Sequence, residues 1–220
     1  MSAKRKRERA AALAAASARQ PLAPGTEPPI VASVDAAAWS AWLAEHHASS
    51  PGVRLKIAKE GSGHASVSYP EAVVETLVWG WIDGQKGKLD AAWWLQRFTP
   101  RSTRSIWSKI NCTKAEELIA AGRMQPPGLA EVERAKRDGR WERAYESQSR
   151  ATVPAELTAA LAESPRAAAF FATLDSRNRY AVLFRLHTAK KPETKAASVA
   201  RFVAMFEKGE TIYPCAVVAR

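Results

Sequence analysis

Residues 78–111 read VWGWIDGQKGKLDAAWWLQRFTPRSTRSIWSKIN and hold five of the chain's eight tryptophans, with six Lys/Arg and two Asp. A buried core favours Leu, Ile and Val, because their side chains leave no polar atom to satisfy. Indoles interleaved with Arg, Lys, Ser and Asn therefore indicate a segment that presents a surface as well as filling a core. Trp79 to Gly84 predicts a strand that enters an Asp-Gly turn, and Trp93 to Phe98 predicts the returning strand.

Two helices and another strand are predicted upstream of this hairpin. Apolar spacing predicts a helix over residues 35–47, and alternating apolar and basic residues predict a half-exposed strand over residues 52–59. Ser68 and Glu71 have the spacing of a capping box, which predicts a helix to about residue 78.

Downstream of the hairpin the pattern is helical. Thr113 and Glu116 have the spacing of a second capping box, and Pro126 opens a further helix that ends by Gly139. A polar connector at residues 146–154 follows. The remaining helices are expected near residues 155–162, 166–174, 177–188 and 193–208.

Early strands and late helices predict the α+β class. We expect a small antiparallel sheet with helices in the N-terminal part, and an all-α C-terminal part. The predicted organisation is a disordered basic tail over residues 1–29, an α+β Trp-rich domain over residues 30–145 and a helical region over residues 146–220.

The charge of the chain favours polyanionic partners. Its 220 residues carry a formal charge of +11, and the density of basic residues is highest in the first nine residues. Such a field attracts nucleic acid and other polyanions, although a composition rich in Arg and Ala would give the same excess. The tail either holds a polyanion loosely or keeps the protein soluble.

The cysteines and histidines predict neither a metal site nor a cofactor. Cys112 and Cys215 lie far apart, and the four His form no ligand spacing with them or with one another. Reduced thiols, a leader region too alanine-rich for a secretion signal and the lack of an apolar run of about 20 residues predict a cytoplasmic protein without an integral membrane segment.

Several short motifs occur in order between residues 35 and 212. They include Gly80-Trp-Ile-Asp-Gly84, Phe98-Thr-Pro-Arg101, Ser105-x-Trp107-Ser-Lys-x-Asn111 and Ala189-Lys-Lys-Pro-Glu-Thr194. Together they resemble the bacterial YdeI/OmpD-associated (OmdA-like, bacteriocin-protection) family. The resemblance implies a protein with an indirect role in stress or antimicrobial-peptide tolerance, and the family name implies a link to an outer-membrane porin. Relatives often carry Arg just after this Thr, where the chain has Ala196-Ala197-Ser198.

The candidate ligand-binding residues come from the hairpin and from the loop that follows it. They are Trp79, Trp81, Asp83, Lys86, Arg101, Arg104, Trp107, Lys109 and Asn111. In the loop, Arg forks suit phosphate or carboxylate, Ser and Asn supply further donors, and an indole can stack on a base or sugar. The competing interpretation is a polar loop whose Arg residues pair with local acids and whose Trp fills the core.

Asp83 is the most conspicuous carboxylate, since flanking indoles could raise its pKa toward general-acid use. An Asp-Gly hairpin turn explains the same residue without any chemistry. No second carboxylate, His or Cys stands near it in sequence, so we assign no catalytic residue.

Two function hypotheses follow. The first is a non-enzymatic anion- or nucleic-acid-binding module, in which the basic strand, the hairpin and the loop form one face. The alternative is a small-molecule-binding protein or enzyme with a Trp-walled pocket that uses Asp83, Arg101 and Arg104. A scaffold that contacts another protein through exposed Trp is a third possibility.

Overall fold

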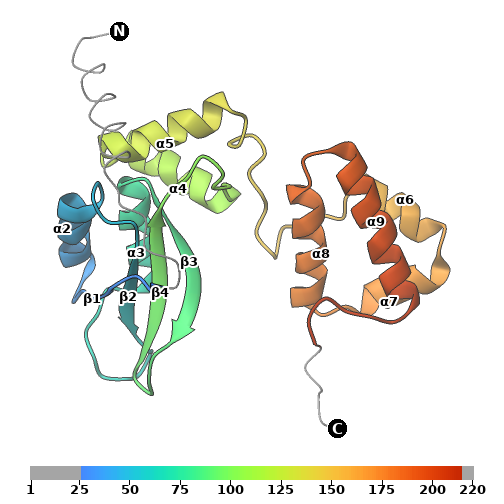
Figure 1. Ribbon diagram of the computed structural model, residues 1–220, viewed down its shortest axis with the longest axis horizontal. Helices are drawn as coiled ribbons and strands as arrows, with labels where there is room; N and C mark the ends of the chain where they lie inside the picture. The colour runs from blue at the N-terminus through green and yellow to red at the C-terminus, as the bar shows by residue number, and fades with distance from the viewer. Residues whose placement is uncertain (1–25, 215–220) are drawn as a thin grey trace. The chain divides into compact units, whose positions relative to one another are not determined.

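The computed structural model describes residues 26–214, which fall into two compact units that divide between Ala144 and Tyr145 (Figure 1). The predicted basic tail, residues 1–29, lies mostly outside the described residues. The first unit contains a sheet and helices, and the described part of the second unit contains helices without strands.

The sheet of the first unit has four strands in the order β1-β2-β4-β3. Their bounds are β1 Ile30–Ala32, β2 Val53–Ala58, β3 Trp81–Lys88 and β4 Trp93–Pro100. The two pairs made by β4 are antiparallel, but β1 pairs parallel to β2. The prediction of an antiparallel sheet is therefore wrong at this edge. A strand of only three residues is too short to produce a readable alternation.

The hairpin turn also differs from its prediction. Asp83 pairs with Phe98, and β3 continues to Lys88 through a register shift just after Asp83. The chain reverses instead at residues 89–92, where the Asp90 carboxylate accepts hydrogen bonds from two backbone N–H groups at 2.8 and 2.9 Å. Asp-Gly is the stronger hairpin signal in sequence, yet here this glycine serves a bulge inside the strand.

Helices α2 (Ala36–His46) and α3 (Tyr69–Val78) cover one face of the sheet. The predicted alternation of β2 is confirmed, because Val53, Leu55 and Ile57 point into this core. The capping box at the start of α3 is also present as predicted. The opposite face of the sheet carries basic side chains. Among the described residues of this unit, no helix covers that face.

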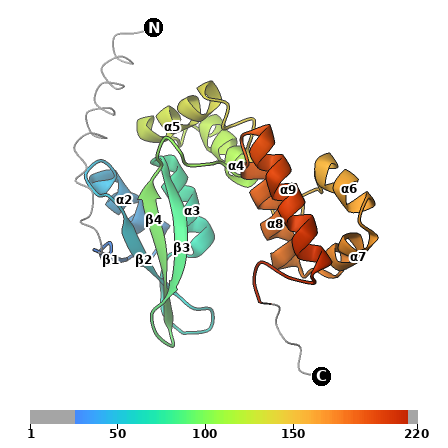
Figure 2. The ribbon, with the colours of Figure 1, turned by 45° about the vertical axis from the view of Figure 1, so that its right-hand side comes forward.

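Helices α4 (Lys109–Ala120) and α5 (Pro126–Arg137) lie at the end of the sheet opposite the hairpin turn (Figures 1 and 2). The capping box predicted at Thr113 is wrong, because α4 begins one turn earlier. Ser108 is its N-cap, and the Ser108 hydroxyl accepts from a first-turn amide at 3.1 Å. Helix α5 begins at Pro126 as predicted.

The second unit is a group of four helices close to the predicted ranges. They are α6 Ala155–Ala162, α7 Pro165–Thr173, α8 Ser176–Thr188 and α9 Pro192–Glu207. The apolar stripe of α9 packs into a core with the other three helices, through Val199, Phe202 and Phe206. Among all described residues, no helix is both long and apolar enough to cross a bilayer.

Candidate functional site

The loop between β4 and α4 is held by hydrogen bonds of its own. The backbone N–H of Ser102 donates to the Ser105 hydroxyl at 2.9 Å, and the backbone N–H of Arg104 donates to the Ser102 hydroxyl at 3.2 Å. These short-range bonds form a tight turn. The Arg104 side chain is exposed at its tip.

Arg101 and Trp107 point inward from this loop. Arg101 is 4% exposed and Trp107 is 2% exposed. The guanidinium carbon of Arg101 lies 3.6 Å from the centre of the Trp107 ring, and its Nη1 donates to the Ile106 carbonyl at 3.2 Å. Trp107 in turn packs on Trp141 at 4.8 Å between ring centres. Both candidate residues therefore fill the interior between the loop and α5.

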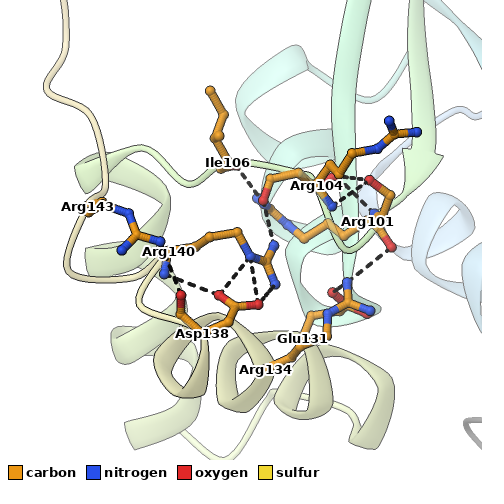
Figure 3. A network of polar contacts seen from close by, with 10 residues as sticks. Arg101, Arg104, Ile106, Glu131, Arg134, Asp138, Arg140 and Arg143 are labelled. Atoms are coloured by element: carbon orange, nitrogen blue, oxygen red, sulfur yellow. Dashed lines mark hydrogen bonds and ion pairs between the residues drawn. The ribbon is translucent and has the colours of Figure 1, made fainter. Parts of the chain in front are cut away.

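A second buried guanidinium joins the loop to the end of α5 (Figure 3). Arg140 is 6% exposed and donates from Nε and Nη2 to the Asp138 carboxylate at 2.7 to 2.9 Å. Its Nη1 donates to the Ser105 carbonyl at 2.6 Å. The hydrogen bonds from Arg140 lower the pKa of Asp138 below its usual value. Segments 35 residues apart in sequence are thus joined by one side chain.

Arg134 makes a further connection between the same segments. Its Nη2 donates to the Arg101 carbonyl at 3.5 Å and also forms an ion pair with Glu131. The loop is consequently tied to α5 at two points. The 2.6 Å bond from Arg140 to the Ser105 carbonyl is the stronger of the two connections, because it is short and charge-assisted.

The joined segments form a strongly basic surface. Residues 101–109 and 134–143 hold eight Lys/Arg and two Asp/Glu, a net charge of +6. Five of these cations are exposed, and we call them the arginine surface: Arg104, Lys109, Lys136, Arg137 and Arg143. Burial raises the pKa of the nearby Cys112 thiol to about 11, although the positive charges of Lys109 and Lys136 lower it. Cys112 is therefore protonated at neutral pH.

The remaining candidates lie elsewhere in the first unit. Trp81 is fully buried and donates its indole N–H to the His47 carbonyl at 3.3 Å, and half-buried Trp79 packs against the His47 ring. The Asp83 carboxylate accepts from the Tyr69 hydroxyl at 2.8 Å.

Lys86 is exposed and lies over the Trp94 ring, with its Nζ 4.1 Å from the ring centre. Lys86 pairs with Gln96 of β4, and Gln96 precedes Arg101 by five residues. Lys86 and Arg101 are therefore separated by about 15 Å along the strand. Asn111 lies in the first turn of α4, beside the loop. The structure thus brings the loop candidates together and places Lys86 and Asp83 in a different cluster.

Sequence reasoning missed the contribution of α5 and the turn after it. The basic residues at the end of α5 suit the negative end of the helix dipole, so their pattern has a sufficient structural explanation. Only the contacts of Arg140 and Arg134 with the loop show that the end of α5 lies beside the segment that carries Arg104 and Lys109.

Asp138→Asn is expected to remove part of the acid dependence of stability. The wild-type carboxylate contributes stability above the ordinary Asp pKa of about 3.9, and this contribution is lost as pH falls through the lowered pKa of the folded protein. Because the Asp138 side chain is 41% exposed, solvent screening limits the effect to about 1 kcal/mol. Urea unfolding at neutral pH and near pH 3 measures it. The variant should be the less stable protein at neutral pH, and a difference of the same size in acid would contradict the assignment.

No group of three or more His, Cys, Asp or Glu in the described residues is placed to hold a metal ion. A cavity of about 310 Å³ does exist, but its lining residues belong to the second unit. None of the nine candidate residues lines it.

Two family models match the chain, one in each unit. Residues 31–131 match a domain of unknown function (DUF8412), and residues 150–209 match the family described as bacteriocin-protection, YdeI or OmpD-associated. Comparison with curated proteins and with solved structures found no match. The family resemblance predicted across residues 35–212 is thus matched in its C-terminal part, while most of the first unit matches the other model. The helical second unit is thus similar, over residues 150–209, to the family described as bacteriocin-protection, YdeI or OmpD-associated.

Proposed function

We propose that this chain is a non-enzymatic nucleic-acid-binding protein that contacts phosphates through the arginine surface. The observation that supports this proposal is the joining of residues 101–109 to residues 134–143 by Arg140 and Arg134. A net charge of +6 is thereby gathered on one part of the first unit. Guanidinium and ammonium groups are the side chains that most often contact phosphate in nucleic-acid complexes.

The surface is also held in place before any ligand arrives. Arg101 and Arg140 are buried and bonded, so they support the loop and do not themselves reach solvent. Their exposed neighbours then need little reordering to meet a phosphate backbone, which lowers the entropic cost of binding. Contacts to phosphate carry no sequence information, so we expect this surface to bind without sequence preference.

Basic residues on the helix-free face of the sheet extend the positive field. Lys56 and Arg97 are both on this face, and the Nζ of Lys56 lies 4.1 Å from the centre of the Trp93 ring. Arg54 contributes less, because it forms an ion pair with Glu27. We infer a cytoplasmic location as part of the same proposal, since nucleic acid is the partner.

The alternative function has less support. Asp83 bonds to Tyr69, while Arg101 is buried against Trp107, so the two groups interact with different neighbours. A shared pocket for Asp83, Arg101 and Arg104 would require the loop to rearrange. As for bacteriocin protection, a protein of charge +11 repels cationic peptides, so any such role of this chain would be indirect.

The test compares two triple variants of the full-length chain. The first removes three cations of the arginine surface, in Arg104→Gln, Lys109→Gln and Lys136→Gln. The matched control removes three exposed cations of the second unit, in Arg166→Gln, Lys190→Gln and Lys208→Gln. Both variants have the same net charge and the same tail.

Binding is measured by anisotropy of a labelled DNA duplex over a range of salt concentrations. Each lost phosphate contact should lower the log–log salt slope by about 0.9, so three contacts weaken binding on the order of 100-fold near 0.1 M salt. The control variant should lose a few-fold at most. Equal losses in the two variants would mean that bulk charge, not this surface, carries the binding, and would overturn the proposal.

A further inference from the structure

The second unit contains a cavity of about 310 Å³ that the proposed function does not use. It lies between the connector that begins at Tyr145, helix α8 and the first turn of α9. Every lining residue falls between Tyr145 and Lys195, so the cavity belongs to the second unit alone.

One wall of the cavity is aromatic. Tyr145 meets Phe184 edge-on at 5.0 Å between ring centres, and Tyr180 lies 5.9 Å from Phe184. The Tyr180 hydroxyl donates to the Glu146 carbonyl at 3.0 Å, which ties the connector to α8. Burial raises the pKa of Tyr180, so this wall stays uncharged at neutral pH. Flat apolar surfaces of this kind favour a planar ring as ligand.

The lining also includes one acidic and two basic residues, Glu146, His187 and Lys195. His187 comes from the last turn of α8, and Lys195 from the first turns of α9. The Lys195 ammonium donates to the Glu156 carboxylate at 2.6 Å, and this bond lowers the pKa of Glu156. The ammonium has three donors, so it can donate to a second carboxylate without releasing the first.

We propose that this cavity binds a small aromatic acid, with its ring against Tyr145, Tyr180 and Phe184 and its carboxylate on Lys195. A water occupies about 30 Å³ in the liquid, so the cavity has room for roughly ten to fifteen non-hydrogen atoms. One or two fused rings with a single carboxylate fill that space. This binding would be independent of the arginine surface, which lies in the other unit.

The probe for the test is 2-naphthoate, titrated into the full-length chain by isothermal calorimetry. For a ligand of this size we expect a Kd on the order of 0.1–1 mM. Lys195→Gln should weaken binding about ten-fold, because it removes the charge-assisted bond. The matched control is Lys208→Gln at the other end of α9, which removes the same charge outside the cavity and should leave the affinity unchanged.

A second probe and a second variant locate the ligand. The uncharged analogue 2-naphthylmethanol should bind about ten-fold more weakly than 2-naphthoate to the wild-type chain, and equally to wild type and Lys195→Gln. Ala189→Leu places a larger side chain in the lining and should abolish binding of both probes. Failure of 2-naphthoate to saturate below about 10 mM, or equal effects of the Lys195 and Lys208 variants, would overturn the proposal.

Discussion

Trp107→Ala is expected to lower the free energy of unfolding of the first unit by about 3–5 kcal/mol. The indole is 2% exposed and lies in the core formed by α3, α4 and α5. Its removal leaves a cavity beside Trp141 and takes away the ring on which the buried Arg101 guanidinium rests. Urea unfolding followed by far-ultraviolet circular dichroism measures the loss without relying on the mutated fluorophore.

The control for this change is Trp93→Ala. Trp93 lies half-buried on the helix-free face of the sheet and contacts Lys56 and His64. Losing the cation–π contact should cost about 0.5–1 kcal/mol. A Trp107→Ala protein that keeps wild-type stability but no longer binds DNA would make Trp107 a ligand-contacting residue, against its placement in the core.

Gly128→Ala is expected to destabilise the first unit by about 2–3 kcal/mol. A Cβ at this position would lie 2.3 Å from the Val78 carbonyl oxygen and 2.9 Å from that of Leu77, which are backbone atoms with little freedom to move. Alanine gains about 1 kcal/mol of helix propensity over glycine, so the clash has to exceed that gain. Helix α5 would have to shift away from α3, and the contacts of Arg134 and Arg140 with the loop would weaken with it.

Gly87→Ala serves as the matched substitution. A Cβ there would meet its nearest neighbour, in Leu95, at 3.7 Å, which is ordinary van der Waals contact. We expect a change within about 0.5 kcal/mol. Thermal or urea unfolding of both variants checks the pair, and a Gly128→Ala protein as stable as wild type would refute the close approach of α5 to α3.

The two structural predictions bear on how the arginine surface can be tested. Arg101 was a ligand candidate in the sequence, but its burial against Trp107 means that Arg101→Ala would combine a folding defect with any loss of binding. The exposed cations Arg104, Lys109 and Lys136 avoid this problem. DNA binding by variants at these positions tests the arginine surface itself. The stabilities of the Trp107 and Gly128 variants test the packing of the helices and loop that carry it.

Local sequence signals predicted most helices because each has its own start and stop. Ser68 with Glu71 begins α3, Pro126 begins α5, and the stripe of α9 follows helical spacing. The failures share a cause. At Asp83 and at Thr113 a good local signal was present, but pairing with Phe98 and capping by Ser108 satisfied the backbone in another way.

The candidate site was predictable only as a set of residue types. The loop's Arg, Ser and Trp do lie together, but their role in binding a ligand stays a prediction. Which of them face solvent could not be read from the sequence, because an Arg beside an indole is equally consistent with a stacked, buried pair. The cations of α5 were missed because a basic helix end already has a local explanation.

By itself, then, the sequence determined the helical second unit and its similarity to the YdeI or OmpD-associated family, the basic charge, the Trp-rich hairpin and the inward face of β2. These depend on neighbours a few residues apart, through caps, period and composition. Tertiary structure alone decided the parallel edge strand, the burial of Arg101 and the joining of Ser105 to Arg140. Each of these depends on partners more than twenty residues away or on packing around a buried group, and such contacts leave no periodic trace in the chain.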